Sequence, residues 1–378
     1  EILNYKLYGV LVGDLIYDSY LRYNELHTVD LNDQKFLEFT ENCYNYFVSV
    51  KNIFDKNKVK AVILSHTVYL PAFAGRYALK KKIDFYNCGI THLVKLSKKN
   101  FFNDIYENYK KEFNNFPKKE KDIKIAIAKK EIKRKLDGKV STNMENLKFS
   151  PFSKKKINNK LFNKNNKIKI LVASHCLMDS PHAFGPWHFS DFTEWLEFLG
   201  KISLKTNYDW YIKPHPNDMK LNYKYINSFL NRYKKFKLIN AVTSHHSLKN
   251  NIDYVVTVWG NIAMDLALLD IPVINTHPKG RFTSFNFNYN PKTISSLKKI
   301  LMNLKKKSNL KININEIYKC FYMHHYEYHN SWLIKDYVEV MRKLGYYNKD
   351  DYIIYKYWIQ NFSFKKHLNI EEKVFNFI

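Results

Sequence analysis

The feature that most constrains the fold is a series of short apolar segments that alternate with stretches of helical spacing. In the second half of the chain, residues 167–173 (KIKILVA), 209–213 (DWYIK), 253–258 (DYVVTV) and 272–275 (PVIN) have the length and composition of buried strands. Between them, residues 191–202 and 260–269 are predicted to be helices, with Asp191 and Glu194 as N-cap and N3 residues. Strands that alternate with helices predict a parallel sheet.

The first half of the chain shows the same alternation. Residues 6–15 (KLYGVLVGDL) and 59–65 (VKAVILS) read as buried strands, and residues 33–54 between them have helical spacing. From about residue 98 the sequence becomes rich in Lys and Asn, which predicts helices with solvated faces and then a linker near residues 137–166. After about residue 292 the chain reads as mostly helical. The pattern therefore predicts an α/β fold with two doubly wound parallel-sheet domains, at residues 1–150 and 151–315, and a helical tail at 316–378.

Composition narrows the classes of protein and partner. The chain has 378 residues, with 62 Lys and Arg against 35 Asp and Glu, a net charge of +27. Only six of the basic residues are Arg, the residue that makes bidentate base contacts, so specific nucleic-acid recognition is not expected. Attraction to an anionic membrane surface is a second interpretation, after compositional bias. Four widely spaced Cys indicate no disulfide framework and favour a reducing cytoplasm. No apolar run is long enough to span a membrane.

The sharpest local motif is Lys213-Pro214-His215-Pro216 at the end of a predicted strand. In open α/β sheets, ligands bind beyond the carboxyl ends of the strands. The two prolines stiffen the backbone, and Lys213 and His215 are suited to a diphosphate or a departing phosphate. A Pro-stiffened strand exit with a capping His is the structural alternative.

A second motif runs from Thr257 to Asp265, where a predicted strand enters a Gly260-Asn261 turn and then a helix. A helix N-terminus attracts phosphate, and Asp265, one turn in, could accept hydrogen bonds from ribose hydroxyls. Alternatively, Gly260 and Asn261 are ordinary capping residues, and Asp265 is a first-turn charge.

The two motifs together, followed by the Ile271-Pro272-Val273-Ile274 segment, resemble the C-terminal half of GT-B glycosyltransferases, particularly bacterial capsule and surface-polysaccharide transferases. The resemblance covers about residues 167–275. Parts of it are shared with UDP-sugar epimerases and teichoic-acid glycerophosphotransferases. It implies two domains that face each other across a cleft. It also implies transfer of a sugar from a nucleotide-activated donor to a capsule or surface-glycan acceptor.

The resemblance also gives roles to loop histidines. His175 and His182 follow the strand at residues 167–173, where such enzymes have a donor-side loop. Each is either a ligand contact, His175 to donor phosphate and His182 on the acceptor side, or a satisfied loop histidine.

The first domain is expected to bind the acceptor and to supply a general base. Asp14 or Asp18 could deprotonate the acceptor hydroxyl, and His66, just past a strand end, is the rival base. The structural alternative has one Asp as a helix N-cap and Asp18 paired with Arg22. Arg76 either binds an anionic acceptor group or lies on a helix surface.

Other chemistries are less well supported by the sequence. No Asp-x-Asp triplet, P-loop or dinucleotide fingerprint occurs, so no metal or cofactor is expected beyond the donor itself. Cys320, His324, His325 and His329 have metal-like spacing, but their surroundings are aromatic. His245 and His246 follow a predicted strand, and a nucleobase contact is a guess from their position.

The expected partners are the nucleotide-sugar, a glycan or lipid-linked acceptor and the anionic inner-membrane surface, with a cytoplasmic location and peripheral membrane association as a second expectation. The alternatives are transfer of a phosphoalditol, or a non-catalytic polybasic membrane- or RNA-binding protein.

Overall fold

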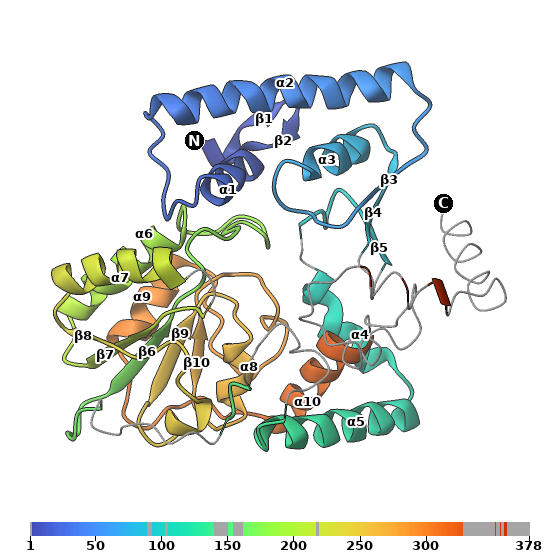
Figure 1. Ribbon diagram of the computed structural model, residues 1–378. Helices are drawn as coiled ribbons and strands as arrows, with labels where there is room; N and C mark the ends of the chain where they lie inside the picture. Colours follow the sequence, from blue (N-terminus) through green and yellow to red (C-terminus); the bar gives the residue numbers. More distant parts are fainter. Residues whose placement is uncertain are drawn as a thin grey trace.

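The computed structural model describes residues 2–88, 93–102, 105–139, 150–153, 162–216 and 219–327, together with residues 352, 356, 359 and 360 (Figure 1). Two α/β units are visible, one at the top of the view and one below it. Most of the predicted linker near residues 137–166 and most of the tail beyond residue 327 lie outside the described residues.

The second unit is built on a five-stranded parallel sheet in the order β10-β9-β6-β7-β8. Its strands are β6 (Lys169–Ala173), β7 (Asp209–Lys213), β8 (Phe236–Leu238), β9 (Tyr254–Thr257) and β10 (Val273–Asn275). Each strand predicted in this region is confirmed. If these five strands are numbered 1 to 5 along the chain, they lie in the order 5-4-1-2-3, which is the doubly wound arrangement. The direction in which successive strands are added reverses between β6 and β9.

Side chains alternate between the two faces of the sheet, and each face packs into its own hydrophobic core. Ile170, Val172, Trp210 and Ile212 pack on one side with α6 (Phe192–Leu204), α7 (Met219–Arg232) and α9 (Ile294–Met302). Leu171, Tyr211 and Val255 pack on the other side with α8 (Ile262–Ala267). Because both faces are covered, the strands are apolar throughout rather than alternating with polar residues.

Helices from before residue 150 complete the second face. α4 (Tyr109–Asn115) and α5 (Lys118–Leu136) follow a 3₁₀ helix (Ile105–Asn108) and pack against α10 (Ile314–Tyr322), which continues as a π-helix (Met323–Glu327). Phe113 of α4, Ile132 of α5 and Phe321 of α10 belong to the same core as Val255. The domain division at residue 150 stays a prediction, but these helices pack with the second sheet.

The first unit departs from the predicted doubly wound sheet. Residues 6–15 form a hairpin of β1 (Lys6–Leu7) and β2 (Val10–Leu11), and then α1 (Gly13–Tyr23), instead of one strand. The reason is the two-residue loop Tyr8-Gly9, in which both residues have positive φ, 47° and 73°. This is the geometry of a type I′ turn, which reverses the chain.

The remaining strands of the first unit form a three-stranded sheet, β3-β4-β5. β3 (Ala61–Leu64) and β4 (Asp84–Cys88) are parallel, whereas β5 (Leu93–Leu96) is antiparallel to β4. The long helix α2 (Gln34–Lys56), predicted from its helical spacing and capped by Asp33, lies along the outer edge, and α3 (Ala72–Lys80) connects β3 to β4 (Figure 1). The prediction of two doubly wound sheets therefore holds for the second unit and is wrong for the first.

Candidate functional site

At the carboxyl ends of β6 and β9, where the strand order reverses, His175 lies beside the predicted motif that runs from Thr257 to Asp265. His175 follows β6, and its Nε2 accepts a hydrogen bond of 3.3 Å from the backbone N–H of Trp259, which follows β9. Its ring stacks on Phe192 of α6, with centroids 4.9 Å apart. Burial first, and the charge of His215 second, lower the pKa of His175 well below its ordinary value. A neutral ring that accepts at Nε2 carries its proton on Nδ1 and can donate it.

Lys213 ends β7 with a buried ammonium group. The side chain belongs to a residue only 9% exposed, and no described residue accepts a hydrogen bond from its Nζ. Burial lowers its pKa to about 8. Nearby, His245 is buried and its Nδ1 also lacks a hydrogen-bond partner among the described residues. An unpartnered cation in this place is suited to a phosphate oxygen.

Asp265, predicted to bind a ribose, is paired with a lysine in this structure. Its carboxylate forms an ion pair with Lys135 of α5, and both side chains are buried. Its second oxygen lies 3.7 Å from Nδ1 of His245. Five of the six residues of α8 are buried, and its first-turn acid is directed toward α5.

The Gly260-Asn261 turn leads into a shorter helix than the sequence predicts. α8 has six residues, and the Asn261 side chain makes no capping bond; it accepts instead from Arg281 at 3.1 Å. Gly260 lies beside His175, since a Cβ atom added there would be 3.7 Å from Nε2 of that ring. Nε2 of His246, a residue predicted from its position to contact a nucleobase, lies 2.8 Å from the carbonyl oxygen of Leu136.

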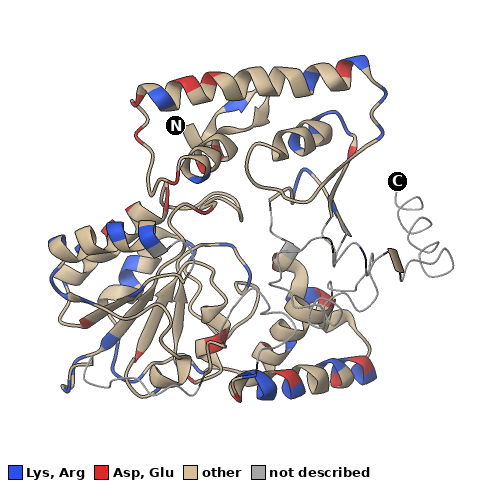
Figure 2. Ribbon diagram, in the orientation of Figure 1, with Lys and Arg blue, Asp and Glu red and all other residues tan. Residues whose placement is uncertain are grey.

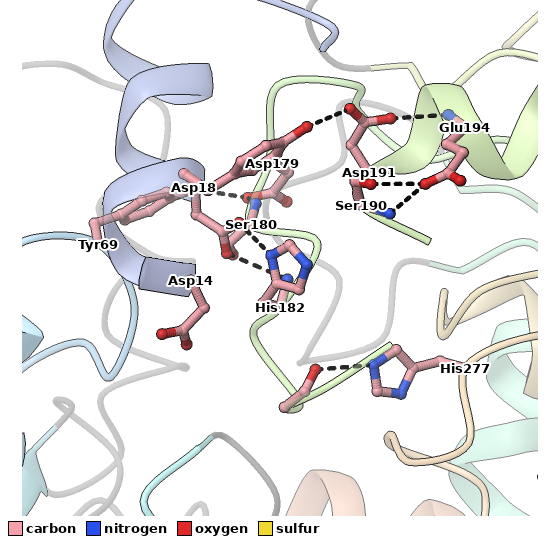
Figure 3. Close-up of polar contacts among 12 residues, drawn as sticks. Asp14, Asp18, Tyr69, Asp179, Ser180, His182, Ser190, Asp191, Glu194 and His277 are labelled. Carbon is pink, nitrogen blue, oxygen red and sulfur yellow. Dashed lines mark hydrogen bonds and ion pairs between the residues drawn. The ribbon is translucent and has the colours of Figure 1, made fainter. Parts of the chain in front are cut away.

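A second cluster joins α1 of the first unit to the loop after β6 (Figure 3). Asp18 of α1 lies 2.7 Å from Nδ1 of His182, and its other oxygen accepts the backbone N–H of the same residue at 3.2 Å. Both side chains are buried. The sequence predicted roles for both residues but not the contact, because they are 164 positions apart.

The charges of this pair stabilise each other. Burial raises the pKa of the Asp18 carboxyl to about 6, although the charge of His182 opposes the change. Burial acts to lower the pKa of His182, but the charge of Asp18 and its hydrogen bond outweigh this and raise it. Nε2 of His182 is buried and has no hydrogen-bond partner among the described residues. The arrangement leaves one ring nitrogen of His182 available for a proton, with Asp18 fixing the ring through the other.

Asp14 and Arg76, predicted as a general base and an acceptor-binding residue, form an ion pair with each other. Nη1 and Nη2 of Arg76 donate to the two oxygens of the Asp14 carboxylate at 2.6 Å, and both side chains are buried. Arg76 also donates to the carbonyl of Leu11 at 3.0 Å, and Phe101 and Phe102 lie about 5 Å from its guanidinium carbon. This buried bidentate pair holds α3 to the start of α1, so neither group faces a ligand here.

His66 stands past the end of β3, as predicted, and its side chain is exposed. Among the described residues, its side chain contacts the neighbouring Ser65 hydroxyl, which lies 2.9 Å from Nδ1. No described carboxylate orients its ring in the way that Asp18 orients His182. As a base, it stays an untested prediction.

Three further hydrogen bonds between the units, some of them drawn in Figure 3, were missed by the sequence interpretation. Asp191, confirmed as the α6 N-cap, also accepts hydrogen bonds from the Tyr17 hydroxyl at 2.7 Å and the Thr28 hydroxyl at 2.6 Å. Tyr69, with a φ of 62°, donates to Asp179 at 3.0 Å. No local pattern marks these partners, because each lies more than 100 positions from the other.

The Cys320 region shows packing rather than ligation in its described part. Cys320 is buried in the core of the second unit, and the ring of His324 packs among Tyr106, Tyr109 and Phe282. His329 lies outside the described residues. Within the part of the chain that the structure describes, no group of three potential metal ligands occurs.

Comparisons with known proteins find weak structural similarity. The chain matches no protein-family profile, and no curated sequence is significantly similar to it. It is similar to the beta Kdo 2,7 transferase KpsC of Thermosulfurimonas dismutans, with a TM-score of 0.40, 13% identity and coverage of 75% of this chain and 86% of that chain. The beta Kdo 2,4 transferase KpsC of the same organism also gives 0.40 and 13%, over 69% and 78%. A co-structure of MnaA from S. aureus with UDP gives 0.27 and 13%, over 83% of both chains.

The described residues contain no helix long and apolar enough to cross a membrane.

Proposed function

We propose that this protein is a glycosyltransferase that moves a sugar from a nucleotide-activated donor to a surface-glycan acceptor. The second unit would bind the donor at the carboxyl edge of its sheet, and α1 of the first unit would contribute to the acceptor side, in a GT-B-like arrangement. One observation carries the proposal: the buried Lys213 ammonium, which has no acceptor among the described residues and lies at the carboxyl end of a strand.

A donor phosphate would give Lys213 the partner it lacks. A phosphate oxygen accepts a charge-assisted hydrogen bond, and the low-dielectric surroundings strengthen the attraction. His175, a neutral donor at Nδ1, and the adjoining Gly260 backbone lie at the point where the strand order reverses, the usual ligand position in such sheets. As the sugar–phosphate bond breaks, the positive charge of Lys213 would stabilise the negative charge that develops on the leaving phosphate.

The Asp18–His182 pair would supply the base. The acceptor oxygen would attack the anomeric carbon, its proton would pass to Nε2 of His182, and the bond to the donor phosphate would break. Asp18, bonded to Nδ1 at 2.7 Å, would keep the ring oriented and would stabilise the imidazolium that forms. This replaces Asp14, whose carboxylate is held by Arg76.

Thermal shift with CMP, CDP, UDP and GDP tests the donor site. We expect one nucleotide to raise the melting temperature of the wild type and of Lys205→Met, an exposed lysine after α6, but not of Lys213→Met. An equal response of Lys213→Met would contradict the assigned site. If phosphorus reaches the acceptor in a subsequent transfer assay, the reaction is phosphoalditol transfer instead.

A further inference from the structure

The lysines of α5 fall into two groups with different surroundings. Lys124 and Lys135 point inward, where they pair with Glu327 and Asp265. The outward group is exposed, and no ion pair or hydrogen bond to a described residue engages the side chains of Lys118, Lys119, Lys130 and Lys133. α5 forms an outer edge of the molecule (Figure 2).

Two exposed isoleucines lie among the outward lysines. Ile123 is 53% exposed and Ile127 is 36% exposed, and a spacing of four places them on the same side of the helix. Lys119, four residues before Ile123, and Lys130, three residues after Ile127, extend this row at both ends. Lys119, Ile123, Ile127, Lys130 and Lys133 are called the α5 face below.

The charge on this side of α5 is strongly positive. The exposed charged residues are five lysines, with Lys129 added to the four above, against Asp122, a net of 5 − 1 = +4. The half-buried Arg134 is occupied by Glu131 at 3.1 Å. Exposed aliphatic side chains surrounded by lysines are suited to the boundary of an anionic bilayer, where the lysines meet lipid phosphates and the aliphatic groups leave water.

We propose that the α5 face docks the protein on a bilayer that contains anionic lipids. Ile123 and Ile127 insert between the headgroups, and the flexible lysine stems place their ammonium groups at the lipid phosphates. RNA fits this surface less well, because its recognition favours Arg forks and aromatic stacking, whereas the unpaired cations here are all lysines and the apolar residues are aliphatic. The inference does not depend on the proposed transferase activity.

Co-sedimentation of the full chain with vesicles tests this surface. We expect binding to phosphatidylglycerol–phosphatidylcholine vesicles, weakened by salt, and little binding to pure phosphatidylcholine. Replacing Lys119, Lys130 and Lys133 with Gln should lower affinity on the order of 100-fold, from about fivefold for each lysine at a membrane surface. Ile123→Ala with Ile127→Ala should lower it by about tenfold through lost apolar burial.

A matched control loses the same charge elsewhere. Lys201→Gln, Lys205→Gln and Lys220→Gln remove three exposed lysines on or next to α6 and α7, and should change vesicle affinity by less than about threefold. Equal losses in the two triple variants would overturn the proposal in favour of net-charge attraction, and failure of the wild type to bind anionic vesicles would overturn it directly. Binding of a labelled single-stranded RNA that only the α5 triple variant loses, with vesicle binding unchanged, would assign the face to RNA.

Discussion

Single ionisable side chains in this protein bear on both stability and the proposed chemistry. Lys213 and His182 are both buried. Nζ of Lys213 and Nε2 of His182 each form no hydrogen bond with a described residue. They differ in compensation, because Asp18 balances His182 whereas no carboxylate pairs with Lys213. Lys213 therefore lowers the stability of the free protein, and this cost is reduced when an anion binds.

Replacing Lys213 with Met should stabilise the ligand-free protein. The folded-state pKa is about 8 and the reference value is 10.5, so below pH 8 the buried charge costs about 3 kcal/mol. Because the unfolded chain keeps its proton up to 10.5, the free energy of unfolding of the wild type should rise between pH 8 and 10.5. Urea unfolding at pH 7 should show Lys213→Met to be more stable by about 3 kcal/mol, and at high pH the difference should shrink. Equal stability at pH 7 would mean that the ammonium is compensated.

The Asp18–His182 pair predicts a specific pH dependence of transfer. His182 must be neutral to accept a proton, and Asp18 raises its pKa, so activity should rise with pH as that raised pKa is passed. Asp18→Asn should move this rise to lower pH, while His182→Gln should lower kcat by about 10²- to 10⁴-fold. Initial rates measured across pH give both results. An Asp18→Asn profile identical to that of the wild type would exclude this role for the pair, and His66→Gln serves as the comparison for the rival base.

At the scale of elements, one carboxylate connects the start of α6 with the first unit. Asp191 caps α6 through Glu194 N–H at 2.8 Å and accepts from Tyr17 of α1 and Thr28 beyond it. The same loop, between β6 and α6, carries His182. The position of α1 against this loop, and with it the Asp18–His182 contact, therefore depends on Asp191.

Asp191→Ala should destabilise the protein by about 2 to 4 kcal/mol, from a lost N-cap and a buried Tyr17 hydroxyl left without its acceptor. Tyr17→Phe removes the hydroxyl and leaves the cap, and should cost only about 1 kcal/mol. Urea unfolding monitored by circular dichroism gives both values. A cost for Asp191→Ala no larger than that for Tyr17→Phe would show that the cap contributes little.

At the scale of the whole molecule, the chain before residue 150 contributes to both units. α5 is attached to α8 by the buried Lys135–Asp265 ion pair, which joins residues 130 positions apart. Removing one member leaves an uncompensated buried charge, whereas removing both leaves an apolar contact. The pair therefore fixes α5 on the second unit, and with it the α5 face.

A double-mutant cycle tests this attachment. Asp265→Leu alone should cost about 3 to 5 kcal/mol, and Lys135→Met with Asp265→Leu should cost clearly less than the sum of the single changes. The double variant should keep the nucleotide response of the wild type in thermal shift, since Asp265 faces Lys135. Loss of that response in a folded double variant would return Asp265 to the ribose-binding role predicted from the sequence.

The sequence by itself determined the local elements. Runs such as residues 209–213, the helical spacing of α2 and α6, and the cap Asp191 depend on neighbouring residues, so the pattern predicts them correctly. It also placed Lys213 and His175 beyond strand ends, because strand direction follows from the βα alternation. It failed at residues 6–15, where a turn with positive φ at Tyr8, a non-glycine residue, interrupts an apolar run.

Only the tertiary structure decided how the candidate residues pair. Asp14 pairs with Arg76, 62 positions away, and Asp18 contacts His182, 164 positions away. No local pattern therefore shows that Asp14 is held in an ion pair whereas Asp18 orients a histidine. The burial that raises the pKa of Asp18 and lowers that of Lys213 likewise comes from elements distant in the chain. The identity of a site residue is local, but its charge state and availability depend on desolvation and on partners that only the packed fold brings within reach.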